Sequence, residues 1–307
     1  MEFQHTSVLL EECLEGLNIR PDGIYVDGTT GGAGHSREIA KRLTTGRLYS
    51  FDRDPDAIAV ASERLAQYPC SELVHANFST MDAELAKRGV NQVDGVLLDL
   101  GVSSFQLDTA ERGFSYLNDG ILDMRMSKSG LSAREMVNTY PAEELARIIR
   151  DYGEEKYYYS IAKNIVRQRE VQPIETTRQL SEIVNSSMPA KARREKNPSK
   201  RTFQAIRIAV NEELDSLSQG LENAFSVLSS GGRLVVITFH SLEDRIVKQF
   251  NAKMCQGCIC PPDFPICVCN NRPKARLVNK KPILPSEQEL AHNRRSQSAK
   301  LRILEKY

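Results

Sequence analysis

Short apolar runs alternate with helical patterns over the first hundred residues of the chain. Each run is long enough for a buried strand and is followed by the apolar spacing of a helix that covers a sheet. We predict strands at residues 24–27, 47–51, 72–76 and 93–100, and helices at residues 35–43, 54–67 and 81–88. This alternation favours right-handed crossovers between strands and a parallel sheet.

The alternation stops at about residue 108 and resumes at about residue 202. Between these points there is no convincing buried strand, and helical patterns follow one another at residues 132–140, 142–152, 156–169 and 177–188. After them we predict helices at 202–228 and 241–253, and strands at 233–239, 276–279 and 300–305. The chain therefore reads as an α/β domain of residues 1–107 and 202–307, interrupted by an all-helical insertion of residues 108–201.

The composition narrows the class of protein. Of 307 residues, 40% are hydrophobic and 26% charged, which excludes a disordered or collagen-like chain. A net charge of +1 creates no global field, so a polyanion site must depend on a local basic patch. The longest apolar stretch, residues 234–239, is too short to span a bilayer, and the first residues lack the blocks of a signal peptide. With an odd number of cysteines, seven, these features predict a cytoplasmic globular protein with reduced thiols.

Polar and glycine residues follow each of the first four predicted strands. The first strand leads into the run DGTTGGAGH at residues 27–35, the second ends at Asp52, the third at Asn77 and Phe78, and the fourth at Asp99. Open parallel sheets bind ligands beyond these carboxyl ends. A glycine turn lets the backbone approach a ligand closely, and the Asp52 carboxylate can accept hydrogen bonds from both ribose hydroxyls. The strand ends therefore predict a site for an adenosine cofactor.

Three adenosine cofactors fit this turn to different degrees. The G-x-G-x-x-G pattern of NAD sites is absent, and the G-x-x-x-x-G-K-[ST] pattern of ATP sites occurs nowhere in the sequence. S-adenosylmethionine has no pyrophosphate to place at a helix N-terminus, so it suits a glycine turn that begins with an acidic residue. We therefore expect S-adenosylmethionine as the cofactor.

Longer motifs carry a resemblance to one family. They are HTSVLL at 5–10, GHS at 34–36, DLGVSSFQLD at 99–108, RGFS at 112–115, LDMRM at 122–126, RTFQA at 201–205, FHSLEDR at 239–245 and SAKLR at 298–302. Together they extend nearly from end to end of the chain. By these motifs the sequence resembles the MraW family, the methyltransferases H of small-subunit ribosomal RNA.

The resemblance implies a class I, Rossmann-like methyltransferase sheet and S-adenosylmethionine-dependent methylation of N4 of cytosine 1402 in the 16S rRNA of the small ribosomal subunit. It also implies a set of cofactor contacts: Ala33, Gly34, His35, Asp52, Phe78, Asp99 and Gln106. Three positions depart from the family's usual residues: Ala33 replaces glycine, Ile121 replaces proline and Ser127 replaces aspartate. We expect Ala33 to be tolerated, although it leaves the turn conformation open, because only a positive φ would make it clash.

Methylation of a cytosine amine needs a hydrogen-bond acceptor, because the amine's lone pair is delocalised into the ring. Many amino-methyltransferases place Asp or Asn, two prolines and an aromatic residue after the fourth strand, whereas this chain has Asp99-Leu100-Gly101-Val102. The candidates elsewhere in the matched motifs are Ser103, Ser104, Asp108 and Asp123. We favour Asp123 as the catalytic acceptor. The alternative is that Asp123 has a structural role, by pairing with Arg125 or capping local structure.

The densest basic run, residues 191–201, contains six cations and one acid. Lysine and arginine contacts to phosphate supply much of the affinity for nucleic acid. We therefore expect the following residues to contact the rRNA: Arg193, Arg194, Lys196, Lys200, Arg201 and, at the end of the fifth sheet strand, His240. The alternatives are a solvated charged loop and a structural histidine.

Five of the seven cysteines lie between residues 255 and 269. Four thiolates can hold zinc, and C-x-x-C is a usual half-site. The resemblance points instead to reduced thiols in a proline-rich loop, because zinc is not a feature associated with the family, so we expect no metal. Two rivals to rRNA methylation remain: a non-catalytic RNA-binding assembly factor on the same fold, and a DNA amino-methyltransferase.

Overall fold

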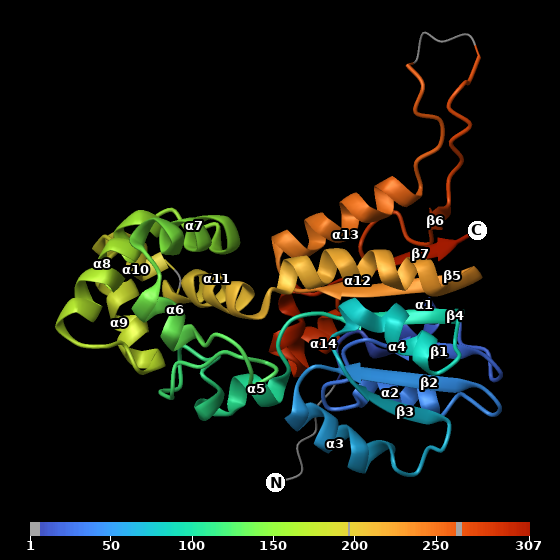
Figure 1. Ribbon diagram of the computed structural model, residues 1–307, viewed down its shortest axis with the longest axis horizontal. Coiled ribbons are helices and arrows are strands. Elements are labelled where there is room, and N and C mark those ends of the chain that lie inside the picture. Colours follow the sequence, from blue (N-terminus) through green and yellow to red (C-terminus); the bar gives the residue numbers. More distant parts are fainter. Residues whose placement is uncertain (1–6, 196, 262–265) are drawn as a thin grey trace. The chain divides into compact units, whose positions relative to one another are not determined.

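The computed structural model describes residues 7–195, 197–261 and 266–307. The chain divides into two compact units (Figure 1). One, which we call the sheet unit, consists of Met1–Gly101 and Leu214–Tyr307, and the other, the helical unit, consists of Val102–Glu213. Among the described residues no helix combines the length and the apolar character that crossing a membrane requires.

A seven-stranded sheet with the order β3-β2-β1-β4-β5-β7-β6 forms the centre of the sheet unit. Its strands are β1 (Ile24–Asp27), β2 (Arg47–Asp52), β3 (Ser71–His75), β4 (Val93–Asp99), β5 (Leu228–Thr238), β6 (Ala275–Leu277) and β7 (Lys300–Lys306). Strands β1 to β5 are parallel, and β7 runs antiparallel to both β5 and β6. The predicted Rossmann-like α/β fold is confirmed, and every predicted strand is present.

Helices cover both faces of this sheet (Figure 1). One face carries α1 (Leu10–Leu17), α2 (Gly34–Ala40) and α3 (Pro55–Leu65), and the other carries α4 (Met81–Lys87), α12 (Glu213–Val227) and α13 (Ser241–Met254). In β4, Leu97 packs in the core of the first face, and Val96 and Leu98 pack in the core of the second. Burial on both faces explains why β4 is nearly all apolar.

The helical unit has a hydrophobic core of its own. Its elements are α5 (Ser104–Asp108), η2 (Ala110–Arg112), α6 (Ala133–Thr139), α7 (Ala142–Gly153), α8 (Tyr158–Val171), α9 (Thr177–Ser186), α10 (Ala190–Glu195) and α11 (Ser199–Asn211). Leu145 and Ile149 of α7 and Ile206 of α11 are completely buried in this core. Short elements complete the sheet unit: η1 (Phe78–Thr80), α14 (Glu287–His292) and η3 (Arg294–Ser298).

The predicted single helix over residues 202–228 is wrong. Glu212 adopts a left-handed conformation (φ 49°, ψ 41°) and separates α11 from α12. Because α11 buries Phe203 and Ile206 in the helical core, it belongs to the inserted unit. The insertion therefore extends over residues 102–213 instead of the expected 108–201.

Candidate functional site

The sheet order reverses direction between β1 and β4. From β1 the chain proceeds outward through β2 to β3, and from β4 it proceeds the other way to β5. Open α/β sheets bind ligands at such a switch point, beyond the carboxyl ends of the strands. Three aspartates lie at these ends, Asp27 on β1, Asp52 on β2 and Asp99 on β4. The structure thus brings together three residues that lie 25 or more positions apart in sequence.

The turn after β1 uses left-handed backbone at two positions. Gly31 has φ 50°, and Ala33, the residue before α2, has φ 59° and ψ 26°. The position that departs from the family pattern therefore does need positive φ, which costs an alanine roughly 1–2 kcal/mol. The Ala33 methyl group is buried against Ala61 and Leu65 of α3, and that burial offsets part of the cost.

Asp52 is fixed by backbone donors from both sides. The N–H of Gly31 donates to its Oδ2 at 2.7 Å, and the N–H of Asp54 donates to its Oδ1 at 2.8 Å. Burial raises the pKa of Asp52, and the hydrogen bonds from Asp54 and Gly31 oppose the rise. The backbone N–H of Arg53 also lowers the pKa of Asp52, so three backbone donors hold its carboxylate in place at the carboxyl end of β2.

The Asp27 carboxylate at the end of β1 stabilises the glycine turn through hydrogen bonds. Its Oδ1 accepts the N–H of Thr29 at 3.1 Å and its Oδ2 accepts the Ser36 hydroxyl at 2.6 Å. Ser36 also contacts the Ser50 hydroxyl at 3.0 Å, so the network joins β1, α2 and β2. Burial raises the pKa of Asp27 to about 6, although the Ser36 and Thr29 hydrogen bonds oppose the rise. Ser36 and Ser50 were not predicted, because isolated serines carry no spacing signal.

Replacing Asp27 with asparagine should remove a pH dependence of stability. The native state binds the Asp27 proton more tightly than the unfolded chain does, since the pKa rises from 3.8 to about 6. Wild-type stability should therefore fall as pH rises through this window, by about 3 kcal/mol for two pKa units. Urea unfolding of both proteins between about pH 4 and pH 7 should show Asp27→Asn gaining that amount relative to wild type. A difference that does not change with pH would contradict the assignment.

Asp99 carries a buried acceptor atom without a partner. Its Oδ1 has no hydrogen bond among the described residues, while its Oδ2 lies 3.7 Å from Nδ1 of His35. His35 is buried and its Nε2–H donates to the carbonyl of Val8 at 3.1 Å. Burial, followed by repulsion from Asp27, raises the pKa of Asp99 well above its ordinary value. A cationic ligand group next to Oδ1 would satisfy this oxygen and stabilise the charged carboxylate.

Phe78 follows β3 and lies at the start of η1. A methyl group on Gly220 of α12 would collide with the Phe78 ring, so ring and helix are in close contact. Asn77 holds the same turn, because its Oδ1 accepts the Ser79 N–H at 3.1 Å and its Nδ2 donates to the Ser216 hydroxyl at 3.1 Å. With its ring packed on α12, Phe78 lies shortly after β3, at the carboxyl edge of the sheet.

Gln106 and Asp123, two further predicted site residues, belong to the helical unit. Gln106 forms a capping box with Ser103 at the start of α5. Asp123 is bound by Arg125, whose Nη2 lies 2.6 Å from Asp123 Oδ2. Burial alone would raise the pKa of Asp123, but the hydrogen bonds and charge of Arg125 outweigh it and hold that pKa below its ordinary value. Asp123 is thus a persistent anion, suited to accepting a hydrogen bond and poorly suited to taking up a proton.

The loop that carries Asp123 is anchored by a buried asparagine that sequence patterns did not identify. Asn211 at the end of α11 accepts the N–H of Met126 at 2.8 Å and donates to the carbonyl of Met124 at 2.7 Å. Arg112 also donates to the carbonyl of Met126 at 3.0 Å. Met124 has a positive φ of 61°, a conformation that these bonds hold in place.

The predicted rRNA contacts fall into three groups. Arg193 on α10 and Lys200 and Arg201 on α11 are exposed, as an electrostatic contact requires. Lys196 and the side chain of Arg194 lie outside the described part of the chain. The His240 side chain accepts the N–H of Glu243 and so caps α13, and its contact with rRNA stays a prediction.

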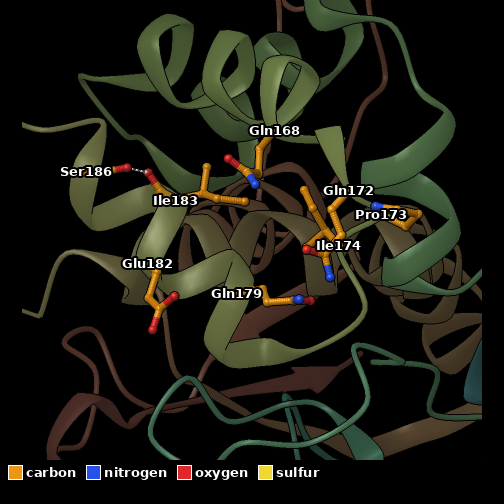
Figure 2. A pocket seen from close by; sticks show the side chains of 8 residues that line it. All are labelled: Gln168, Gln172, Pro173, Ile174, Gln179, Glu182, Ile183 and Ser186. Atoms are coloured by element: carbon orange, nitrogen blue, oxygen red, sulfur yellow. Dashed lines mark hydrogen bonds between the residues drawn. The ribbon is translucent and has the colours of Figure 1, made fainter. Parts of the chain in front are cut away.

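A separate pocket of about 290 Å³ lies between α8 and α9 in the helical unit (Figure 2). Its lining is Gln168, Gln172, Pro173, Ile174, Gln179, Glu182, Ile183 and Ser186. The Ser186 hydroxyl donates to the carbonyl of Ile183 at 2.9 Å, which closes one edge. None of the residues predicted for cofactor, catalysis or rRNA lines this pocket.

Comparison with known proteins agrees with this geometry. The model of the MraW methylase family matches residues 2–307. The chain is 56% identical to ribosomal RNA small subunit methyltransferase H 2 of Agathobacter rectalis, covering 100% of this chain and 99% of that protein. It is 54% and 53% identical to the ribosomal RNA small subunit methyltransferases H of Lachnospira eligens and Clostridioides difficile, covering 100% of this chain and at least 98% of each relative. The chain therefore belongs to the MraW methylase family.

Proposed function

We propose that this protein is a ribosomal RNA methyltransferase of the small subunit, and that it methylates N4 of cytosine 1402 in 16S rRNA. The methyl donor is S-adenosylmethionine. The observation that carries the proposal is the buried Oδ1 of Asp99 at the switch point of the sheet, which has no hydrogen-bond partner in the described part of the chain. Relatives that share more than half of their residues with this chain are named as rRNA methyltransferases, which supports the substrate class.

The residues at the strand ends fit this cofactor. Asp52 lies at the end of β2, where its carboxylate would accept the ribose hydroxyls, and the backbone N–H groups of Gly31 and Asp54 fix its orientation. Asp99 offers a buried carboxyl oxygen that a positively charged group would satisfy and stabilise as the anion, and that an NAD or ATP phosphate would not satisfy. The backbone at Ala33, Gly34 and Phe78 would complete the site around the adenosine and the methionine tail. When bound, the cofactor supplies an activated methyl group on a sulfonium.

Methyl transfer to an amine depends mainly on positioning and on the fate of the amine proton. In our proposal Asp123 accepts a hydrogen bond from the cytosine amine and thereby orients its nitrogen. Because Arg125 keeps Asp123 anionic, the proton that the methylated amine loses passes to solvent water, and Asp123 does not store it. The target cytosine must leave any base stack to reach the methyl group, which favours a single-stranded region of rRNA.

Binding of the rRNA is assigned to the exposed cations of the helical unit. Arg193, Lys200 and Arg201 lie within one short segment, α10 to the start of α11. Such cations contact phosphates and fix the register of the RNA without reading its bases. Arg194 and Lys196 lie in the same segment of the sequence, and we propose that they contact the rRNA as well.

Incubation with methyl-labelled S-adenosylmethionine and small subunits that lack the modification tests the proposal. Label is expected in 16S rRNA, and digestion to nucleosides should place it in N4-methylcytidine. Cofactor binding without any transfer would establish the rival, a non-catalytic assembly factor. Label in another nucleoside of the rRNA would keep the substrate class and overturn the N4 assignment, and label in added duplex DNA would point to the DNA enzyme.

A further inference from the structure

Between α13 and β6 the chain runs out from the helices and back again (Figure 1). Its two arms carry four cysteines, Cys258 and Cys260 on the outgoing arm and Cys267 and Cys269 on the returning one. We call these four residues the cysteine cluster. All four sulfur atoms lie within 4.8 Å of one another. Their sulfur atoms lie 3.4 Å apart in Cys258 and Cys267, 3.6 Å apart in Cys267 and Cys269, and 3.7 Å apart in Cys258 and Cys269.

These separations match the edges of a metal–thiolate tetrahedron. Four sulfurs each about 2.3 Å from a zinc ion lie about 3.8 Å from one another. The cluster therefore has nearly the size of a closed Zn²⁺ site. Each arm supplies two of the four sulfur atoms from one C-x-C pair.

Backbone N–H groups point at the sulfurs, which favours thiolates over thiols. The N–H of Ile259 donates to Cys269 and the N–H of Val268 donates to Cys260, both at 3.3 Å. The N–H of Asn271 donates to Cys269 at 3.4 Å. The residue inside each C-x-C pair thus donates to the last sulfur of the opposite pair. This reciprocal arrangement provides the outer-shell hydrogen bonds that metal ligands use.

Among the described residues of the two arms, few other contacts join one arm to the other beside the cysteine cluster. Asn271 joins them nearer the sheet, where its side-chain nitrogen donates to the carbonyls of Gln256 and Gly257 at 3.0 and 2.6 Å. Ile259, Ile266 and Val268 are exposed and build no core. Cys255, the fifth cysteine of this segment, packs on the core beneath α13 and is not part of the cluster. A cross-link at the cluster would therefore be the main constraint on the outer part of both arms.

We propose that Cys258, Cys260, Cys267 and Cys269 bind one structural Zn²⁺ through their four sulfur atoms. Four Zn–S bonds form, the thiol protons pass to solvent, and no electron is transferred. With all four positions taken by protein ligands, the ion has no open position and serves to fix the two arms. This departs from the expectation of no metal, which rested on the resemblance alone, and it goes beyond the proposed methyltransferase function.

Metal analysis of the full-length chain, purified under reducing conditions without chelator, tests the site. We expect about one zinc per wild-type chain and per Cys255→Ser chain, the matched control. Cys267→Ser should weaken zinc binding by about 100-fold or more, since one of four thiolates is lost. Cobalt added to the metal-depleted, reduced wild-type chain should produce the visible bands of a tetrahedral thiolate complex, and these bands should be absent in Cys267→Ser.

Two further measurements separate a loss of zinc from a loss of the fold or of cofactor binding. Circular dichroism and S-adenosylmethionine affinity of Cys267→Ser should equal those of wild type, since the cluster lies in neither the core nor the cofactor site. Reduced wild-type protein without zinc and without cobalt bands would overturn the proposal. Equal zinc content in Cys267→Ser and wild type would also overturn it, as would two disulfides within the cluster in protein purified without zinc.

Discussion

Replacing Asp52 with alanine should weaken S-adenosylmethionine binding by at least about 100-fold. The carboxylate is expected to accept two ribose hydroxyls, and each hydrogen bond to a charged group contributes about 1.5–3 kcal/mol. Two such bonds amount to at least 3 kcal/mol, which is about 100-fold in affinity. The substitution also removes the acceptor of the Gly31 and Asp54 N–H groups, so the glycine turn loses its anchor. Isothermal titration calorimetry with the purified chain measures the effect.

A neighbouring aspartate provides the matched control. Asp22 is exposed in the loop before β1, and Asp22→Ala should bind the cofactor with wild-type affinity. Asp52→Asn keeps one acceptor oxygen and should lose only about tenfold, in line with one lost bond. If Asp52→Ala bound S-adenosylmethionine with wild-type affinity, the assignment of the cofactor to these strand ends would be wrong, and the proposed function would lose its support.

Replacing Asp123 with alanine should lower the rate of methyl transfer by about 100-fold, because the amine loses the acceptor that orients it. Asp123 belongs to the helical unit and is not among the expected cofactor contacts, so S-adenosylmethionine affinity should stay at the wild-type value. A single-turnover assay with saturating cofactor and small subunits isolates the transfer step from cofactor binding.

Arg125→Ala separates the catalytic role of Asp123 from a structural one. This variant breaks the ion pair but leaves the carboxylate, which still accepts the backbone N–H of residue 125 at 2.9 Å. If Asp123 orients the amine, Arg125→Ala should keep its rate within about tenfold of wild type. If the ion pair only holds the loop, Asp123→Ala and Arg125→Ala should lose rate and melting temperature in parallel, and the catalytic assignment fails.

The strands and their polar ends were predictable from the sequence for a simple reason. A strand buried on both faces must be apolar along its whole length, as in Val96, Leu97 and Leu98 of β4, and its first polar residue marks the edge of the sheet. Asp27, Asp52 and Asp99 were found in this way, and the parallel topology then required them to share one edge. The fold and the candidate cofactor site thus follow from local pattern together with one topological rule.

Other features depend on contacts between residues far apart in sequence. The break at Glu212 falls inside a continuous helical pattern with no glycine or proline close to it, and it exists because α11 packs in the helical core. The left-handed backbone at Ala33 is offset by burial against α3, although an alanine by itself does not predict positive φ. Similarly, Asn211 gives no sequence signal, and its role comes from the loop at residues 124–126 that folds onto it.

Sequence by itself determined the order of the strands along the chain, the acidic residues at their ends and the family, because these depend on periodicity and on motifs. Tertiary structure decided which charged groups are paired. It joined Asp123 to Arg125, placed His240 as the cap of α13, left one oxygen of Asp99 without a partner among the described residues and brought four cysteines within bonding range of a single ion. The physical reason is that pairing and burial depend on distances in space, and residue types at a given spacing do not fix those distances.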